Sequence, residues 1–341
     1  MTTTLYIYVG HENCGSGLIR QTLAAGHGAL MSAGIGLCSA AFSVVGKKAG
    51  VTFPDALIAD KLGAQQAGKK MDLAAEFQAL HAKAEALKLK AVILTGEGLN
   101  TPAAADMLAA AKSYFDCKII YYFARQDDWL VESWRRGAFK TGVGLHTYVQ
   151  EQLSAADKGI YQGVLSAYIG VFGAEHMRVR LTWPKVLEGG HIAADFWSAV
   201  GAEATLAPEL PTEEAGLTDE LRSALKESPY LFDGTNDSEL TDFITSMHVT
   251  SGSARGYPLD DDTRREIMER FKAENHWIKH TFLKDFAMPG WNSVPKRQGA
   301  EPIENDPVTV AGVTEALNLN LMLLKELRED ISKIKKNMGL K

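Results

Sequence analysis

Cysteine is scarce in this sequence, with three residues among 341. The positions are scattered: Cys14, Cys38 and Cys117. So few and so distant thiols do not build a disulfide framework or a zinc cluster, and they are typical of a reducing compartment. The first residues also lack the basic start and apolar core of a signal peptide. We therefore expect a cytoplasmic protein.

Long hydrophobic runs and an excess of positive charge are also missing. The longest apolar runs, such as residues 91–94 and 119–124, are the size of a strand, whereas a membrane span needs ~20 residues. The 36 Lys and Arg residues are outnumbered by 42 Asp and Glu residues, which gives a net charge of -6. This balance argues against a general nucleic-acid binder but permits a local basic pocket for phosphates. We expect no membrane span and no nucleic-acid partner.

Three strand–loop–helix repeats fill the first part of the chain. Short apolar runs predict strands at residues 5–9, 91–95 and 118–123. Helical patterns follow them at residues 16–25, 103–115 and from 127 to about 140. Successive repeats of this kind predict parallel strands joined by crossover helices. The predicted fold class is α/β, a three-layer α/β/α arrangement with a mainly parallel central sheet.

The rest of the chain is less regular. Residues 44–70 show no clear period, whereas 71–89 read as an amphipathic helix. Further elements are a strand at 177–182, a helical pattern at 183–202, an irregular connector at 207–237 and a strong helix at 260–283. We expect residues 1–285 to form one α/β domain, residues 286–310 to be a linker and residues 311–341 to be a helical extension.

The helical extension carries a heptad pattern. Apolar residues repeat every seven positions in one series, Leu317, Leu324, Ile331 and Met338, and a second series is Asn320, Leu327 and Ile334. This pattern favours a short coiled coil, which would make a homo-oligomer through residues 317–338. The alternative is an amphipathic helix that lies on its own domain.

A glycine loop follows the first strand and reads Gly10-His11-Glu12-Asn13-Cys14-Gly15-Ser16-Gly17. Gly10 and Gly15 have the spacing of the phosphate loop in ATP- and GTP-binding proteins, but the Lys-Ser/Thr pair is replaced by Ser16-Gly17. Without that lysine a nucleotide kinase is disfavoured. Backbone N–H groups at a helix N-terminus still bind phosphate through their dipoles. The alternative is a tight glycine turn with no ligand.

Two other strand ends add polar side chains. Ligands of parallel sheets bind outside the C-terminal ends of the strands. Glu97 follows the second strand, Arg125 ends the third, and Ser133 lies in the helix after Arg125. An arginine and a hydroxyl group can form a second anion pocket beside the glycine loop. Two such pockets suit a nucleotide that carries phosphate at both ends.

The sequence from residue 121 to 134, YYFARQDDWLVESW, resembles the bacterial sulfotransferase family. Similarities continue in order at residues 93–97, 172–180 and 189–196, and the helix that contains Asn275 looks like the terminal helix of the family. The resemblance covers roughly residues 4 to 284. Its most specific piece is the R-Q-D-D-x-x-x-x-S stretch.

The resemblance implies a P-loop NTPase-like sulfotransferase fold and 3′-phosphoadenosine 5′-phosphosulfate (PAPS) as co-substrate, with no metal. Carried over by position, the loop for the 5′-phosphosulfate is Asn13, Cys14, Gly15, Ser16 and Gly17, and the pair for the 3′-phosphate is Arg125 and Ser133. The family usually has Lys where this chain has Asn13, and Ser or Thr where it has Gly17. Either Arg20 or Lys47 supplies the missing charge, or the protein binds the nucleotide without efficient catalysis.

The activity that the resemblance implies is transfer of a sulfuryl group to a hydroxyl or amine of a glycan or another small acceptor. This reaction needs a base for the acceptor proton. Glu97 is the first candidate and His11 the second. Their alternatives are a charge that stabilises the start of the next helix for Glu97 and a loop hydrogen bond for His11. A catalytically impaired nucleotide- or glycan-binding protein is the second hypothesis for the whole chain.

One pair of histidines has metal-ligand spacing. His276 and His280 lie four residues apart, and Glu274 is close in sequence. Because no third ligand stands at a useful distance, we interpret the pair as a solvated helix face and predict no metal site.

Overall fold

The computed structural model describes residues 2–69, 73–155, 159–209, 217–246 and 258–284, and with them residues 291, 294, 319, 320, 322, 323, 325, 327, 330, 331, 333 and 334. The chain divides into two compact units. The first contains residues 1–129, 156–211 and 268–292. The second contains residues 130–155, 212–267 and 293–341.

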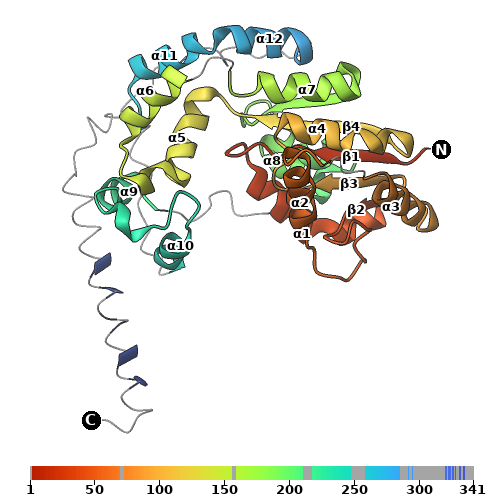
Figure 1. Cartoon of the computed structure of the whole chain (residues 1–341), viewed down its shortest axis with the longest axis horizontal. Coiled ribbons are helices and arrows are strands. Elements are labelled where there is room, and N and C mark those ends of the chain that lie inside the picture. Colours follow the sequence, from red (N-terminus) through yellow and green to blue (C-terminus); the bar gives the residue numbers. More distant parts are fainter. Residues whose placement is uncertain are drawn as a thin grey trace. The chain divides into compact units, whose positions relative to one another are not determined.

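A five-stranded sheet forms the centre of the first unit (Figure 1). Its strands are β1 (Thr4–Tyr8), β2 (Ile35–Leu37), β3 (Ala91–Thr95), β4 (Asp116–Phe123) and β5 (Met177–Leu181). The strand order is β2-β3-β1-β4-β5, and every neighbouring pair is parallel. The predicted α/β class with a parallel central sheet is confirmed.

The central strands β1 and β3 are buried and mostly apolar because the sheet is covered on both faces, whereas the edge strand β5 alternates buried apolar residues with Arg178 and Arg180. All five residues of β3 are buried, and so are the last four of β1. Such continuous apolar runs are typical of buried parallel strands. In the register of the sheet, Tyr8 at the end of β1 pairs with Thr95 of β3 and with Ile120 of β4. The three strand ends that the sequence singled out therefore lie at one edge of the sheet.

Helices flank this sheet. They are α1 (Ser16–Ser32), α2 (Asp55–Gln66), α3 (Ala74–Ala86), α4 (Pro102–Leu108), α7 (Gln162–Phe172), α8 (Ile192–Ala199) and α12 (Lys272–Phe282). The connection from β1 to β2 and the connection from β3 to β4 run in opposite directions along the sheet. Because crossovers are right-handed, they place their helices on opposite faces. Accordingly α1 packs on α8, and α4 packs on α7. A ligand crevice is expected beside β1, where the direction changes.

The second unit is helical. It holds α6 (Leu145–Ala155), α9 (Asp219–Leu225), α10 (Glu239–Ser246), most of α5 (Gln126–Arg136) and most of α11 (Asp261–Arg270). Charged groups tie these helices together. Arg135 of α5 donates two hydrogen bonds to Asp219 of α9, of 2.8 and 2.6 Å. Such a bidentate arginine–carboxylate pair fixes both position and orientation.

Several elements differ from the sequence prediction. The region 44–70 contains α2, which buries only Ile58 and Leu62 and so has too few apolar residues for a visible period. The helix predicted over 260–283 is two helices, α11 and α12, which meet at Phe271. Within 183–202 the α-helix α8 is short, and the predicted connector at 207–237 contains α9. Short helices with few buried positions are the ones that the periodicity misses.

The C-terminal region is described only in part. Its described positions between 319 and 334 are helical. The predicted linker lies almost entirely outside the described residues, so the domain boundary at residue 285 stays a prediction. In the part of the chain that the structure describes, no helix has both the length and the apolar character of a membrane span.

Candidate functional site

The glycine loop runs from the end of β1 into α1, whose first residue is Ser16. Gly15 is the N-cap, and among the described residues no side chain caps this helix. The first N–H groups of a helix have no acceptor within the helix itself, and they carry the positive end of the helix dipole. No acidic residue lies in the first turn of α1. The start of α1 is therefore suited to hold an anion.

Backbone geometry explains two residues of this loop. Gly15 has a φ of 79°, and a Cβ there would come within 2.3 Å of Ile192 Cδ1. Only glycine fits the turn. Asn13 also lies in the left-handed region, with a φ of 59°. Because asparagine tolerates this region better than lysine does, Asn13 suits the local backbone.

The side chains of two loop residues, His11 and Cys14, are buried. The His11 ring meets those of Tyr121, Trp129 and Tyr161 edge to face, at centroid distances of 5.8, 5.9 and 5.0 Å. Its Nδ1 donates to the Glu12 carbonyl at 3.0 Å, and burial lowers the pKa of His11. Burial also raises the pKa of the Cys14 thiol to about 12. Both groups are therefore neutral at pH 7. The loop hydrogen bond that the sequence offered as the alternative role of His11 is present.

A charged cluster joins α1, the start of α2 and the residue pair that follows β3. Arg20, one turn into α1, donates to Glu97 Oε1 at 3.1 Å and to Asp55 Oδ2, and its guanidinium lies 4.5 Å from the centre of the Phe53 ring. Asp55 Oδ1 in turn accepts from the backbone N–H of Glu97 at 2.7 Å. The Glu97 side chain is 80% exposed. Glu97 is thus accessible to an acceptor molecule and held beside a cation.

The two candidate cations, Arg20 and Lys47, lie near different parts of α1. Arg20 follows Ser16 by one helical turn and lies on the same side of the helix. The Lys47 backbone instead lies beside Gly28, because a Cβ on Gly28 would come within 3.6 Å of the Lys47 carbonyl oxygen. Gly28 is about 18 Å along the helix axis from Ser16. Arg20 is therefore the better placed of the two to contact an anion at the start of α1.

Arg125 follows β4 and is buried. Its Nε and Nη2 donate to the two carboxylate oxygens of Asp127, each at 3.0 Å, and Nη1 donates to the Trp291 carbonyl at 3.1 Å. The same segment contacts the loop, because Trp129 Nε1 donates to the Glu12 carbonyl at 2.9 Å. The start of α5 and the glycine loop are therefore joined, and Arg125 is held in a fixed orientation by Asp127.

Ser133 lies on α5 in the part that belongs to the second unit. There it is hydrogen-bonded to the Tyr148 side chain of α6. Its predicted pairing with Arg125 as a phosphate site stays a prediction.

Glu274 and Asn275 brace the segment that follows β4. Glu274 is buried and accepts hydrogen bonds from the N–H groups of Ile160, Tyr161 and Gln162 at 3.2, 2.7 and 2.8 Å. Asn275 exchanges two hydrogen bonds with Gln126, of 2.7 and 3.0 Å. The Glu274 carboxylate is thus engaged by backbone N–H groups at the start of α7. Among the described residues, no three His, Cys, Asp or Glu side chains are grouped as a metal site.

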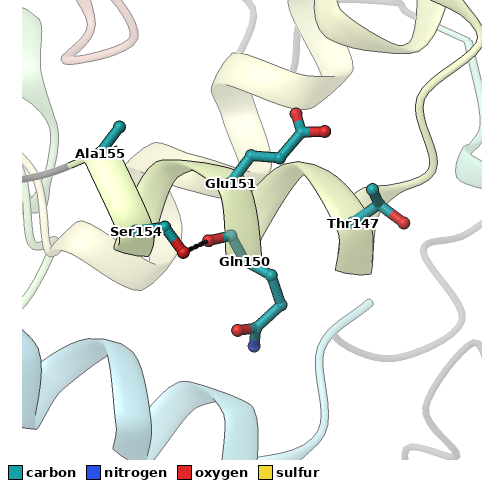
Figure 2. Close-up of a pocket in the computed structure, with 5 residues that line it drawn as sticks. All are labelled: Thr147, Gln150, Glu151, Ser154 and Ala155. Atoms are coloured by element: carbon teal, nitrogen blue, oxygen red, sulfur yellow. Dashed lines mark hydrogen bonds between the residues drawn. The ribbon is translucent and has the colours of Figure 1, made fainter.

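A shallow cavity of about 520 Å³ lies along α6 in the second unit. It is lined by Thr147, Gln150, Glu151, Ser154 and Ala155. Figure 2 shows that the Gln150 and Glu151 side chains leave the helix in opposite directions, so they do not converge on one ligand. None of the residues that the sequence predicts for the site lines this cavity.

Asp55 lies in the same cluster of charged residues, but it was not predicted from the sequence. It contacts both Arg20 and Glu97, and it opens α2 directly after Pro54. A proline–acidic pair is a helix-start signal. The signal was present, but it stood in a region without apolar periodicity.

The sequence matches no family model, and no curated protein matches it. A solved structure of a sulfotransferase from Alicyclobacillus acidocaldarius is similar to this chain, with a TM-score of 0.44 and 14% sequence identity. The match covers 85% of this chain and 99% of that chain. A similarity this low establishes neither a family nor an activity.

Proposed function

We propose that the protein is a cytoplasmic sulfotransferase that moves a sulfuryl group from PAPS to a hydroxyl or amine of a glycan or another small acceptor. The observation that carries the proposal is the uncapped N-terminus of α1 next to the Arg20–Glu97 pair. The start of α1, which is suited to bind an anion, and the accessible Glu97 carboxylate thus lie where the neighbouring strands β1 and β3 end. The sequence resemblance supplies the identity of the donor.

In this proposal, the loop from Asn13 to Gly17 holds the 5′-phosphosulfate through backbone N–H groups at the start of α1, while the Cys14 N–H stays bonded to the His11 carbonyl. Arg125 with Ser133 binds the 3′-phosphate. The acceptor oxygen attacks the sulfur and forms a new O–S bond. The bond from sulfur to the bridging phosphate oxygen breaks, and its electron pair leaves with adenosine 3′,5′-bisphosphate. The acceptor proton passes to the Glu97 carboxylate. Correct placement of donor and acceptor supplies the remaining catalysis.

In this proposal, Arg20 supplies the positive charge of the lysine that the resemblance implies at position 13. Its guanidinium has donors in a planar fork, which suits the oxygens of a phosphate group. Asp55 holds the guanidinium in place while Glu97 remains exposed. Developing negative charge on the bridging oxygen would be stabilised by this cation.

A specific observation favours the second candidate, a protein that binds the nucleotide or a glycan but catalyses poorly. Arg20 is already paired with two carboxylates, and Arg125 is paired with buried Asp127. Paired arginines attract an added phosphate less strongly than unpaired ones. This candidate predicts binding of adenosine 3′,5′-bisphosphate without measurable turnover.

Thermal unfolding with added nucleotides tests binding. We expect adenosine 3′,5′-bisphosphate to raise the unfolding temperature, since a ligand that binds only the native state stabilises it. ADP and GDP serve as controls for general nucleotide binding and should raise it less. Absence of any shift with the bisphosphate would refute the sulfotransferase proposal and weaken the binding alternative.

Transfer of labelled sulfate from PAPS to a panel of glycans separates the enzyme from the binding protein. We expect transfer by the wild type, and a loss of ~10²-fold or more in Glu97→Ala, because a positioned general base contributes about that much. Glu85→Ala removes another exposed carboxylate, 64% exposed and paired with His81, and should keep full activity. Equal activity in both variants would remove Glu97 from the mechanism.

A further inference from the structure

Tyr8 carries a buried hydroxyl group that the proposed mechanism does not use. It is the last residue of β1, and its side chain is fully buried. Among the residues that the structure describes, its hydroxyl has no hydrogen-bond partner. Buried polar groups nearly always have a partner, so an unpaired hydroxyl next to a loop calls for a physical explanation.

The phenol ring of Tyr8 lies against the glycine loop. A Cβ built on Gly10 would lie 3.4 Å from Tyr8 Cε1 and 3.5 Å from Cζ, the atom that bears the hydroxyl. The same Cβ would lie 3.3 Å from the Cβ of Ser16, the first residue of α1. The hydroxyl-bearing end of Tyr8, the Gly10 backbone and the start of α1 therefore converge on one small region.

Neighbouring rings hold Tyr8 in this position. Phe196 and Tyr122 meet it edge to face, at centroid distances of 5.2 and 6.2 Å. Burial raises the pKa of Tyr8 well above its ordinary value, so the phenol stays protonated and remains a hydrogen-bond donor. A fixed donor beside uncapped N–H groups matches the acceptor oxygens of a tetrahedral anion.

We infer that the Tyr8 hydroxyl is an additional donor to the anion held at the start of α1, where it binds an oxygen of a phosphate or sulfuryl group from the core side of the loop. This inference rests on the proposed function in that it takes the loop as the anion site. It adds a side-chain donor to a loop that has no lysine. It also gives the unpaired hydroxyl a partner in the bound state.

Tyr8→Phe tests the inference, because it removes the hydroxyl oxygen and keeps the ring. Tyr121→Phe is a matched control. Tyr121 is also fully buried, and its hydroxyl likewise has no partner among the described residues. The probes are inorganic sulfate and adenosine 3′,5′-bisphosphate, measured by isothermal titration calorimetry on the full chain. We expect Tyr8→Phe to weaken bisphosphate binding about tenfold, as for loss of one hydrogen bond to a charged group, and Tyr121→Phe to leave binding unchanged.

The outcomes separate this inference from the proposed function. If the wild type binds the bisphosphate and Tyr8→Phe binds it equally well, the inference is wrong and the proposed function stands. An equal loss of bisphosphate affinity in both variants would show that any change in the core weakens binding, and this result would also overturn the inference. Sulfate binding that depends on Tyr8 without bisphosphate binding would support the inference and refute the PAPS proposal. If the wild type binds neither probe, both fall. Thermal unfolding of each variant confirms that the fold is intact.

Discussion

At position 13, the backbone conformation and the charge needed to bind a phosphate favour different residues. The left-handed φ of 59° at Asn13 favours asparagine, whereas the sequence resemblance to sulfotransferases would place a lysine at this position. The glycine spacing and the missing lysine were readable from the sequence. The positive φ of Asn13 could not be predicted from the sequence, because it depends on how the loop packs on the aromatic rings of the core.

Asn13→Lys would restore the family charge at the cost of backbone strain. We expect the variant to bind adenosine 3′,5′-bisphosphate about tenfold more tightly, because a charged donor is added. Its free energy of unfolding should fall by about 1 kcal/mol, the penalty for a larger side chain in the left-handed region. Calorimetric titration and urea unfolding measure the two effects. Asn13→Gln carries the strain without the charge, so a matching gain in affinity there would contradict the explanation.

His11 makes stability depend on pH. Burial lowers its pKa below the ordinary value of 6.5 in the folded protein. As the pH falls below that value, the unfolded chain takes up a proton that the folded chain resists, and the free energy of unfolding decreases. We expect the free energy of unfolding to fall by about 1 kcal/mol between pH 7.5 and pH 5.5. The His11→Phe variant should not show this decrease.

Urea unfolding of the wild type and of His11→Phe at the two pH values measures this effect. His276→Phe changes an exposed histidine and should keep the pH dependence of the wild type. If His11→Phe also keeps it, His11 is not the titrating group.

At the scale of elements, the sequence allowed the parallel sheet, the loop before α1 and the meeting of three strand ends to be predicted. Strong apolar runs such as residues 91–95 define buried strands by themselves. The cluster of Arg20 and Asp55 could not be predicted, because it joins two helices through side chains far apart in the sequence. The bracing of α7 by Glu274 was missed for the same reason, since its acceptor comes from a different helix.

Glu274→Gln tests this bracing. The carboxylate accepts hydrogen bonds from backbone N–H groups at the start of α7 and from Gln126 Nε2 at 3.1 Å. Replacing it with a neutral amide removes the charge and turns one acceptor into a donor, so we expect the free energy of unfolding to fall by about 2 kcal/mol. Glu269→Gln changes a carboxylate that is 71% exposed, and it should cost less than about 0.5 kcal/mol. Urea unfolding compares them, and equal effects would contradict this role for Glu274.

The whole molecule consists of two units, and the second includes the helical positions described between residues 319 and 334. Leu327, Ile331 and Ile334 are 57, 45 and 56% exposed in the single chain. They occupy seam positions of the heptad pattern, whose other apolar members Leu317, Leu324 and Met338 lie outside the described residues. Apolar side chains repeated along one face of a helix favour burial against a partner helix. We propose that this partner is a second copy of the chain.

Ile331→Asp should disrupt this association, because it places a charge in the apolar seam. We expect a dimeric mass for the wild type and a monomeric mass for the variant in sedimentation analysis at several concentrations. Lys333→Asp introduces the same residue at a position outside both heptad series and should remain dimeric. A wild type that is monomeric at every concentration would instead support a helix that lies on its own domain.

We propose that the uncapped start of α1 and the segment after β4 together bind a nucleotide with two separate phosphates. Calorimetric titration with adenosine 3′,5′-bisphosphate, and in parallel with adenosine 5′-monophosphate, measures what the second phosphate contributes. We predict that the bisphosphate binds at least about tenfold more tightly, because the second phosphate adds hydrogen bonds to a charged group. Equal affinity for the two nucleotides, or no binding of either, would rule out a site for two phosphates.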